Sequence, residues 1–195
     1  MKVIGITGGI GSGKSTISNM LREQGYVVFD SDVQAKYICD HDIHTIIKIK
    51  EKFGENIYVD GVLDRKTLAK IVFNDKGSLD TLNSIVHPET RDCMYGSIIE
   101  NMKEDVFFVE SAIMFESGLS DLMDYVITIT APKEIRIQRI ISRDNTTKDK
   151  IEDRMNNQMD EKDRLSESDY IISTNQSLQE VEISLFKIVN DIKIK

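Results

Sequence analysis

A glycine-rich segment that directly follows an apolar run constrains this chain more than any other feature. Gly8 and Gly13 stand five positions apart and are followed by Lys14-Ser15, which completes the pattern Gly-x-x-x-x-Gly-Lys-Ser. The apolar run at residues 3–6 precedes the segment, and a helical pattern of apolar residues follows it. Glycines let the backbone bring its N–H groups close to phosphate oxygens, and the start of a helix adds a partial positive charge. The segment therefore predicts a loop that binds a nucleoside triphosphate.

The positions of this loop have separate expected roles. Lys14 should reach the outer phosphates, the Ser15 hydroxyl should bind Mg²⁺, and Thr16 should lie near the inner phosphate. A tight strand-to-helix turn without a ligand is the alternative, but the Lys-Ser pair between a strand and a helix argues against it. The positions expected to bind the nucleotide are Gly9, Gly11, Ser12, Gly13, Lys14, Ser15 and Thr16.

Short, continuous apolar runs alternate with helical patterns along the chain. Runs of this length that are rich in β-branched residues are typical of strands buried on both faces of a parallel sheet. Strands that alternate with helices predict an α/β fold with a doubly wound parallel sheet, here of the P-loop NTPase kind. The five runs are residues 3–6, 27–29, 106–109, 126–129 and 171–172.

Two stretches depart from this alternation. Residues 36–103 contain helical segments and no run typical of a buried strand. Within them, Asp64 can cap one helix, and His87-Pro88 is expected to end one helix and start another. The second stretch, residues 138–167, is highly charged.

Arginines concentrate in and beside the second stretch, which holds five of the eight in the chain when Arg136 is included. Arg136, Arg139 and Arg143 have helical spacing and should share one helix face. Cationic side chains on such a segment can close over a triphosphate and neutralise the transferring charge. For any single arginine, a solvated face or pairing with a nearby carboxylate is the alternative.

The segment Asp30-Ser31-Asp32 follows the apolar run at residues 27–29. In open α/β sheets, ligands bind beyond the carboxyl ends of the strands. A carboxylate at that place can orient an acceptor hydroxyl and take its proton, or hold metal-bound water. Asp after a strand also commonly caps the next helix. Position alone leaves both interpretations open.

Composition and missing motifs exclude several classes of protein. A net charge of -8 over 195 residues argues against a nucleic-acid-binding protein. No glycine has Asp three residues before it, and no Asn-Lys-x-Asp segment occurs, so a GTPase is disfavoured. The three histidines and two cysteines have no metal-ligand spacing. With a GTPase disfavoured, a small-molecule kinase is the expected kind of phosphate-loop protein. The sequence shows no signal-peptide pattern and no long apolar run, so we expect a soluble, cytoplasmic protein with no membrane association.

With these residues in view, the chain resembles the dephospho-coenzyme A kinase family along nearly its whole length. The resemblance implies that ATP phosphorylates the ribose 3′-hydroxyl of dephospho-coenzyme A, which gives coenzyme A and ADP in the last step of coenzyme A synthesis. It implies Mg²⁺ as cofactor and no obligate protein partner. The motifs that carry it are residues 4–16, Asp30-Ser31-Asp32, Leu63-Asp64-Arg65, Ile85-Val86-His87-Pro88 with Arg91, and Phe115-Glu116-Ser117-Gly118-Leu119.

The resemblance also implies a layout within a single kinase domain of residues 1–195, similar to nucleoside monophosphate kinases. The stretch at about 36–103 corresponds to a helical substrate-binding insertion, and that at about 138–167 to a lid. The nucleotide core then comprises about residues 1–35, 104–137 and 168–195.

Individual roles are carried over by the same resemblance. Asp32 matches the family's catalytic aspartate, with Lys14 and Arg139 as further catalytic residues and Arg143 as a second lid arginine at the nucleotide. The positions that match the coenzyme A-binding residues, besides Asp32, are Arg65, His87 and Arg91.

Two points stay open. Glu110 departs from the family pattern after the third strand, and it can either act as an extra acid near Mg²⁺ or cap a turn. A kinase for another nucleotide-like acceptor and a non-catalytic ATP-binding protein remain alternative functions.

Overall fold

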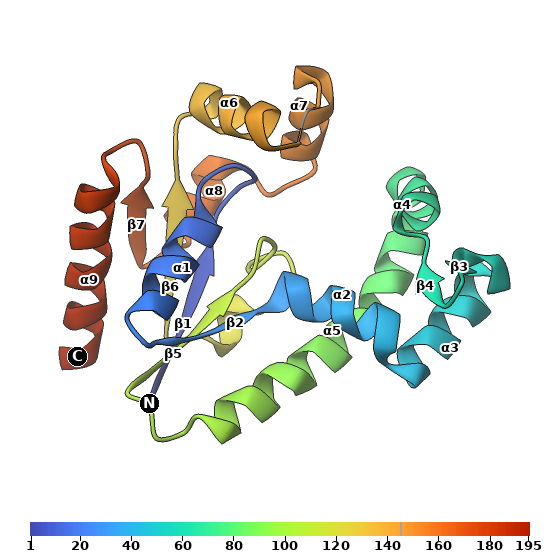
Figure 1. Ribbon diagram of the computed structural model, residues 1–195, viewed down its shortest axis with the longest axis horizontal. Helices are drawn as coiled ribbons and strands as arrows, with labels where there is room; N and C mark the ends of the chain where they lie inside the picture. Colours follow the sequence, from blue (N-terminus) through green and yellow to red (C-terminus); the bar gives the residue numbers. More distant parts are fainter. Residues whose placement is uncertain (145) are drawn as a thin grey trace. The chain divides into compact units, whose positions relative to one another are not determined.

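The computed structural model describes residues 1–144 and 146–195, apart from the side chains of residues 73 and 74. The described chain forms two compact units (Figure 1). The first comprises Met1–Asp30 together with Asn101–Lys195, and the second is Ser31–Glu100. None of the described helices is both long enough and apolar enough to cross a membrane.

A parallel sheet of five strands forms the centre of the first unit, in the order β2-β5-β1-β6-β7. Each apolar run of the sequence lies inside one of these strands, which confirms the predicted α/β fold. The strands are β1 (Lys2–Thr7), β2 (Val27–Asp30), β5 (Val106–Glu110), β6 (Tyr125–Thr130) and β7 (Tyr170–Ser173).

Burial on both faces holds for the inner strands but is wrong for the two edge strands. Every residue of β5 is buried, whereas every residue of β2 is only half-buried and Ile171 in β7 is 50% exposed. An edge strand has a neighbour on one side alone, so continuous apolar residues do not guarantee that both of its faces are covered.

Helices α1 and α9 cover one face of this sheet (Figure 1). Their buried residues, including Ile17 and Leu185, pack in one cluster with Ile4 and Ile6 of β1. Helix α9 buries one apolar stripe against this face, whereas Leu178, its first residue, is 67% exposed. The helices of this unit are α1 (Lys14–Glu23), α6 (Lys133–Asp144), α7 (Lys148–Asn156), α8 (Glu161–Ser166) and α9 (Leu178–Ile194), with a 3₁₀ turn at Ser120–Leu122.

The second unit is mainly helical and has its own core. Its elements are α2 (Ser31–His41), α3 (Ile43–Phe53), the 3₁₀ turn Glu55–Ile57, the strands β3 (Tyr58–Val59) and β4 (Val62–Leu63), α4 (Arg65–Asn74) and α5 (Lys76–Glu100). The short antiparallel pair β3–β4 is a finding that the sequence patterns did not predict. The core is formed by Cys39, Ile49, Ile57, Leu63, Leu68, Ile85 and Val86.

One predicted boundary in this unit is confirmed and one is wrong. Asp64 caps α4 by accepting hydrogen bonds from the N–H groups of Lys66 and Thr67, as its position indicated. Pro88, in contrast, does not divide two helices but lies inside the continuous helix α5. Proline removes one backbone donor from a helix. Val86 and Thr90, on either side of Pro88, are buried, and their packing holds the helix together where the backbone hydrogen bond of Pro88 is missing.

Candidate active site

The glycine-rich loop connects β1 to α1 at the carboxyl edge of the sheet. Gly13 precedes the helix with a φ of 99°, and Gly11 has a φ of 78°, a region that L side chains rarely adopt. Among the described residues, no side chain caps α1. Its first N–H groups therefore suit an anion, which the positive end of the helix dipole also favours.

Lys14 and Ser12 complete the inner side of this loop. The Lys14 ammonium donates a hydrogen bond to the Gly8 carbonyl at 2.8 Å, so that its charge lies beside the loop. The Ser12 hydroxyl is buried and has no hydrogen-bond partner within the described part of the chain. A buried hydroxyl without a partner is costly, which is consistent with a polar ligand at this place.

Arg139, a predicted site residue, lies against the loop. Its guanidinium donates to the hydroxyl and to the carbonyl oxygen of Thr174, both at 2.8 Å. The Thr174 hydroxyl in turn donates to the Ser12 carbonyl at 2.7 Å. Thr174 thus ties Arg139 to the loop, a role that the sequence analysis missed. Its position directly after the last strand was the available signal.

The other two arginines of this helix have different surroundings. Arg136 is buried and donates from Nε to the Ile10 carbonyl at 2.9 Å, and it also pairs with Glu161. Burial lowers the pKa of the Arg136 guanidinium, and the Glu161 carboxylate opposes that shift. Arg143 instead forms an exposed ion pair with Asp144 at 2.6 Å, which raises the Arg143 pKa. Of the predicted nucleotide-binding arginines, Arg139 contacts the loop, whereas Arg143 has an ion-pair partner outside it.

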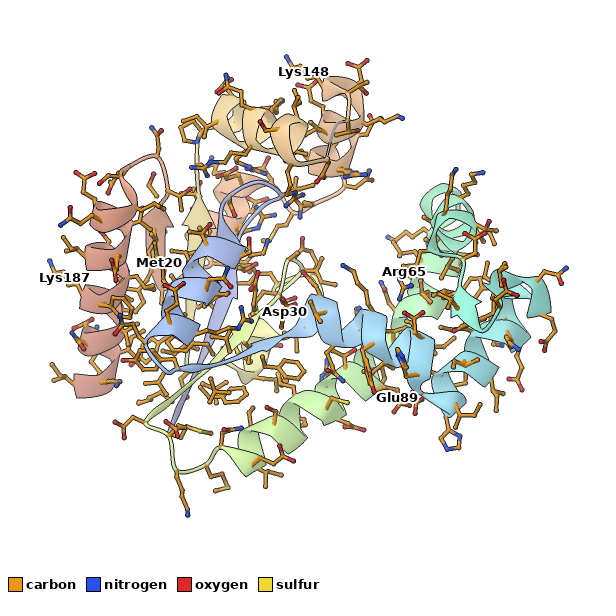
Figure 2. The ribbon with its side chains drawn as sticks, viewed as in Figure 1. Met20, Asp30, Arg65, Glu89, Lys148 and Lys187 are labelled. Atoms are coloured by element: carbon orange, nitrogen blue, oxygen red, sulfur yellow. The ribbon has the colours of Figure 1, made fainter. Side chains whose placement is uncertain are left out.

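Glu110 ends β5 at the same edge of the sheet as the loop. It is buried, and its carboxylate accepts a hydrogen bond from the Ser18 hydroxyl of α1 at 2.5 Å. Asp30, labelled in Figure 2, is its partner in the adjacent strand β2. No three His, Cys, Asp or Glu side chains of the described residues form a metal cluster. A Mg²⁺ ion with few carboxylate ligands and several phosphate oxygens agrees with this donor set.

The remaining predicted residues lie in the second unit. Asp32 is half-buried in the first turn of α2, which begins at Ser31 directly after β2. Arg65, labelled in Figure 2, begins α4 and forms an ion pair of 2.7 Å with Asp40. The hydrogen bond from Arg65 holds the pKa of the Asp40 carboxyl below its usual range. Arg65 also donates to the Lys36 carbonyl at 2.9 Å, so its guanidinium is fixed within this unit.

His87 and Arg91 lie one helical turn apart on α5 and line the same hollow. This hollow has a volume of about 360 Å³. Burial is the larger cause and the nearby Arg91 charge the smaller cause of a lowered pKa of His87, so the neutral form of its imidazole is favoured. The Nε of Arg91 is buried without a hydrogen-bond partner in the described part of the chain. The other lining residues are Asn83, Ser84, Pro88 and Asp92.

Comparison with known sequences identifies the family. The sequence model of dephospho-CoA kinase matches residues 2–180. A dephospho-CoA kinase from Bacillus licheniformis is 35% identical over 191 residues, which cover 96% of this chain and 95% of the relative. The dephospho-CoA kinase from Listeria innocua is 33% identical over 184 residues, or 93% and 92% of the two chains.

Solved structures lead to the same family. A Thermus thermophilus protein has a TM-score of 0.89 and 31% identity, covering 97% of this chain and 96% of its own. Dephospho-CoA kinase from Campylobacter jejuni has a TM-score of 0.72 and 30% identity, covering 98% and 96%. A shikimate kinase from Acinetobacter baumannii, at 19% identity and a TM-score of 0.53, shares the fold alone. The chain therefore belongs to the dephospho-CoA kinase family and is a P-loop kinase.

Proposed function

We propose that this chain transfers the outer phosphoryl group of ATP to the ribose 3′-hydroxyl of dephospho-coenzyme A, with coenzyme A and ADP as products. The observation that carries this proposal is the uncapped start of α1 behind the glycine loop, with Arg139 held beside it, in a chain of this family. Loop N–H groups and cations stabilise charge that spreads over the transferred phosphoryl oxygens.

Each residue of the first unit has a part in binding and orienting ATP. The loop N–H groups surround the inner phosphates, and Lys14 exchanges its Gly8 carbonyl partner for outer phosphate oxygens. Arg139 contributes positive charge at the transferring group. Ser15 and Glu110 are the groups suited to hold Mg²⁺ directly or through water, and the bound ion would neutralise the phosphate charge.

The second unit supplies the acceptor side of the reaction. Asp32 orients the 3′-hydroxyl and accepts its proton as the bond to phosphorus forms. Arg65, His87 and Arg91 bind the coenzyme A moiety, and the charge of the two arginines suits its phosphate groups. In this proposal residues 36–103 form the substrate-binding insertion and residues 138–167 form the lid.

Replacement of the acceptor-orienting carboxylate tests the mechanism. We expect Asp32→Asn to lower the rate of ADP release with dephospho-coenzyme A by about two to four orders of magnitude, because the amide cannot accept the proton. ATP affinity, measured by calorimetry, should be retained. Asp80→Asn, on the exposed surface of α5, is the matched control and should keep full activity. Near-normal turnover of Asp32→Asn would refute the assigned role.

A panel of acceptors tests the substrate itself. Wild-type enzyme should release ADP with dephospho-coenzyme A and much more slowly with nucleoside monophosphates or shikimate. Preference for one of the other acceptors would instead support a kinase of different specificity. ATP binding without transfer to any acceptor would support a non-catalytic ATP-binding protein.

A further inference from the structure

Ile10, at the apex of the glycine loop, is contacted in three ways by residues of α6, of α7 and of the connection between α7 and α8. Its N–H donates to the Gln158 side-chain oxygen at 2.8 Å, and its carbonyl accepts from Nε of Arg136 at 2.9 Å. The Ile10 side chain packs against an apolar cluster formed by Ile137, Ile140, Ile151 and Met155. The two polar contacts involve the peptide units on either side of the same residue.

Gln158 is itself held by its neighbours in the short connection between α7 and α8. The N–H of Met159 donates to a Glu116 carboxylate oxygen at 3.0 Å, and the Met159 carbonyl accepts from Arg164 at 2.7 Å. Arg164 is only 2% exposed, so this contact is shielded from water. Gln158 also lines a hollow of about 350 Å³ together with Arg136. Its side chain therefore extends from a fixed backbone and not from a loose surface turn.

The loop needs such an external contact because of its own composition. Three of the four residues from Gly8 to Gly11 are glycines, and glycine permits many backbone conformations. Ile10 is the residue among them that has a side chain to pack. The Gly9 carbonyl of the peptide between Gly9 and Ile10 accepts from the Ser12 N–H at 3.1 Å, and the Gln158 hydrogen bond restrains the N–H side of the same peptide. Without Gln158 this peptide is held on one side only, and the N–H groups that follow are less firmly directed.

We propose that Gln158 is a positioning residue for the nucleotide, acting through its hydrogen bond to the Ile10 N–H. Its side-chain amide fixes the apex, so that the N–H groups from Gly11 onward point toward the phosphates before ATP binds. This inference rests on the proposed binding of ATP at the loop. It concerns affinity for the nucleotide and is independent of the acceptor.

The expected size of the effect follows from a single hydrogen bond. Loss of one such bond to an uncharged partner corresponds to about a three- to tenfold change in an equilibrium constant. Gln158→Met removes the acceptor oxygen and keeps a side chain of similar length. Gln158→Glu keeps an acceptor at the same reach. Asn157→Ala is the matched control, because Asn157 is the exposed neighbour of Gln158 and its side-chain amide donates to the Asp153 carbonyl of α7.

The test combines calorimetric titration with Mg·ATP and NMR measurement of the solvent exchange of the Ile10 amide. We expect Gln158→Met to weaken ATP binding about three- to tenfold and to speed exchange of that amide, in a protein that remains folded at the temperature of the titration. Gln158→Glu should restore slow exchange of the Ile10 amide, and Asn157→Ala should match wild type in both measurements. Unchanged or tighter ATP binding by a folded Gln158→Met protein, or fast Ile10 exchange in Gln158→Glu, would overturn the inference. Failure of the wild-type protein to bind ATP would refute the proposed function instead.

Discussion

Gly11 shows how strongly a single residue constrains the loop. Its φ of 78° is strained for other residues, and an added Cβ would lie 2.7 Å from the Arg136 carbonyl oxygen. We expect Gly11→Ala to lower the free energy of unfolding by about 1–3 kcal/mol and to impair ATP binding. Gly96→Ala on α5 is the control, because it has open space and an ordinary helical backbone. It should raise stability by about 0.5–1 kcal/mol, and urea denaturation of both variants measures the difference. Equal effects would contradict the account.

At the residue scale the sequence predicted site residues within the loop itself and missed those that reach the loop from distant parts of the chain. Lys14 and Ser15 could be named because their spacing from the glycines is fixed along the chain. The contacts of Thr174 and Gln158 join them to loop residues 162 and 148 positions away, and no spacing rule connects such pairs. The burial of Arg136 was missed for a different reason, because a charged residue on a helix usually faces solvent.

Helix α9 offers a test at the scale of an element. The Ser177 side chain accepts from the Glu180 N–H, and Glu180 in turn accepts from the Ser177 N–H, so the helix start has a complete capping box. We expect Ser177→Ala to lower the free energy of unfolding by about 1 kcal/mol. Ser184, inside the same helix, donates to the Glu180 carbonyl. Ser184→Ala should leave stability unchanged or raise it slightly, because alanine favours helix interiors. A loss of stability in both variants, measured by thermal unfolding, would argue against a specific capping effect.

The elements also show why some patterns are more reliable than others. The five strands were predicted because continuous apolar runs rich in β-branched residues, when they alternate with helical patterns along a chain, are typical of buried parallel strands. The break expected at His87-Pro88 was wrong because proline has a local cost that tertiary packing of α5 can override. The β3–β4 pair was missed because two-residue strands carry no periodic signal.

At the scale of the whole molecule, acid should destabilise the fold. Ion pairs and hydrogen bonds hold the pKa values of several carboxyls, including Asp40 and Asp144, below their unfolded values. The folded protein then binds fewer protons than the unfolded chain, so this stabilisation is present above about pH 4 and is lost as pH falls further. The lowered pKa of His87 acts in the same direction from about pH 6.5 downward. Calorimetry between pH 3 and pH 7 should show a thermal midpoint that falls with acidification, and a maximum near pH 3 would contradict the prediction.

The glycine loop also has a genetic consequence. Glycine is the smallest residue, so every amino-acid replacement at its codon adds atoms. At Gly8 an added Cβ would lie 2.2 Å from the Ile129 carbonyl oxygen, and Gly13 has a φ of 99°. Alanine, the smallest replacement, already adds a clash at Gly8 and backbone strain at Gly13. We therefore expect any codon change that replaces these glycines to impair the loop at once, whereas a replacement of the exposed Asp80 meets no such barrier.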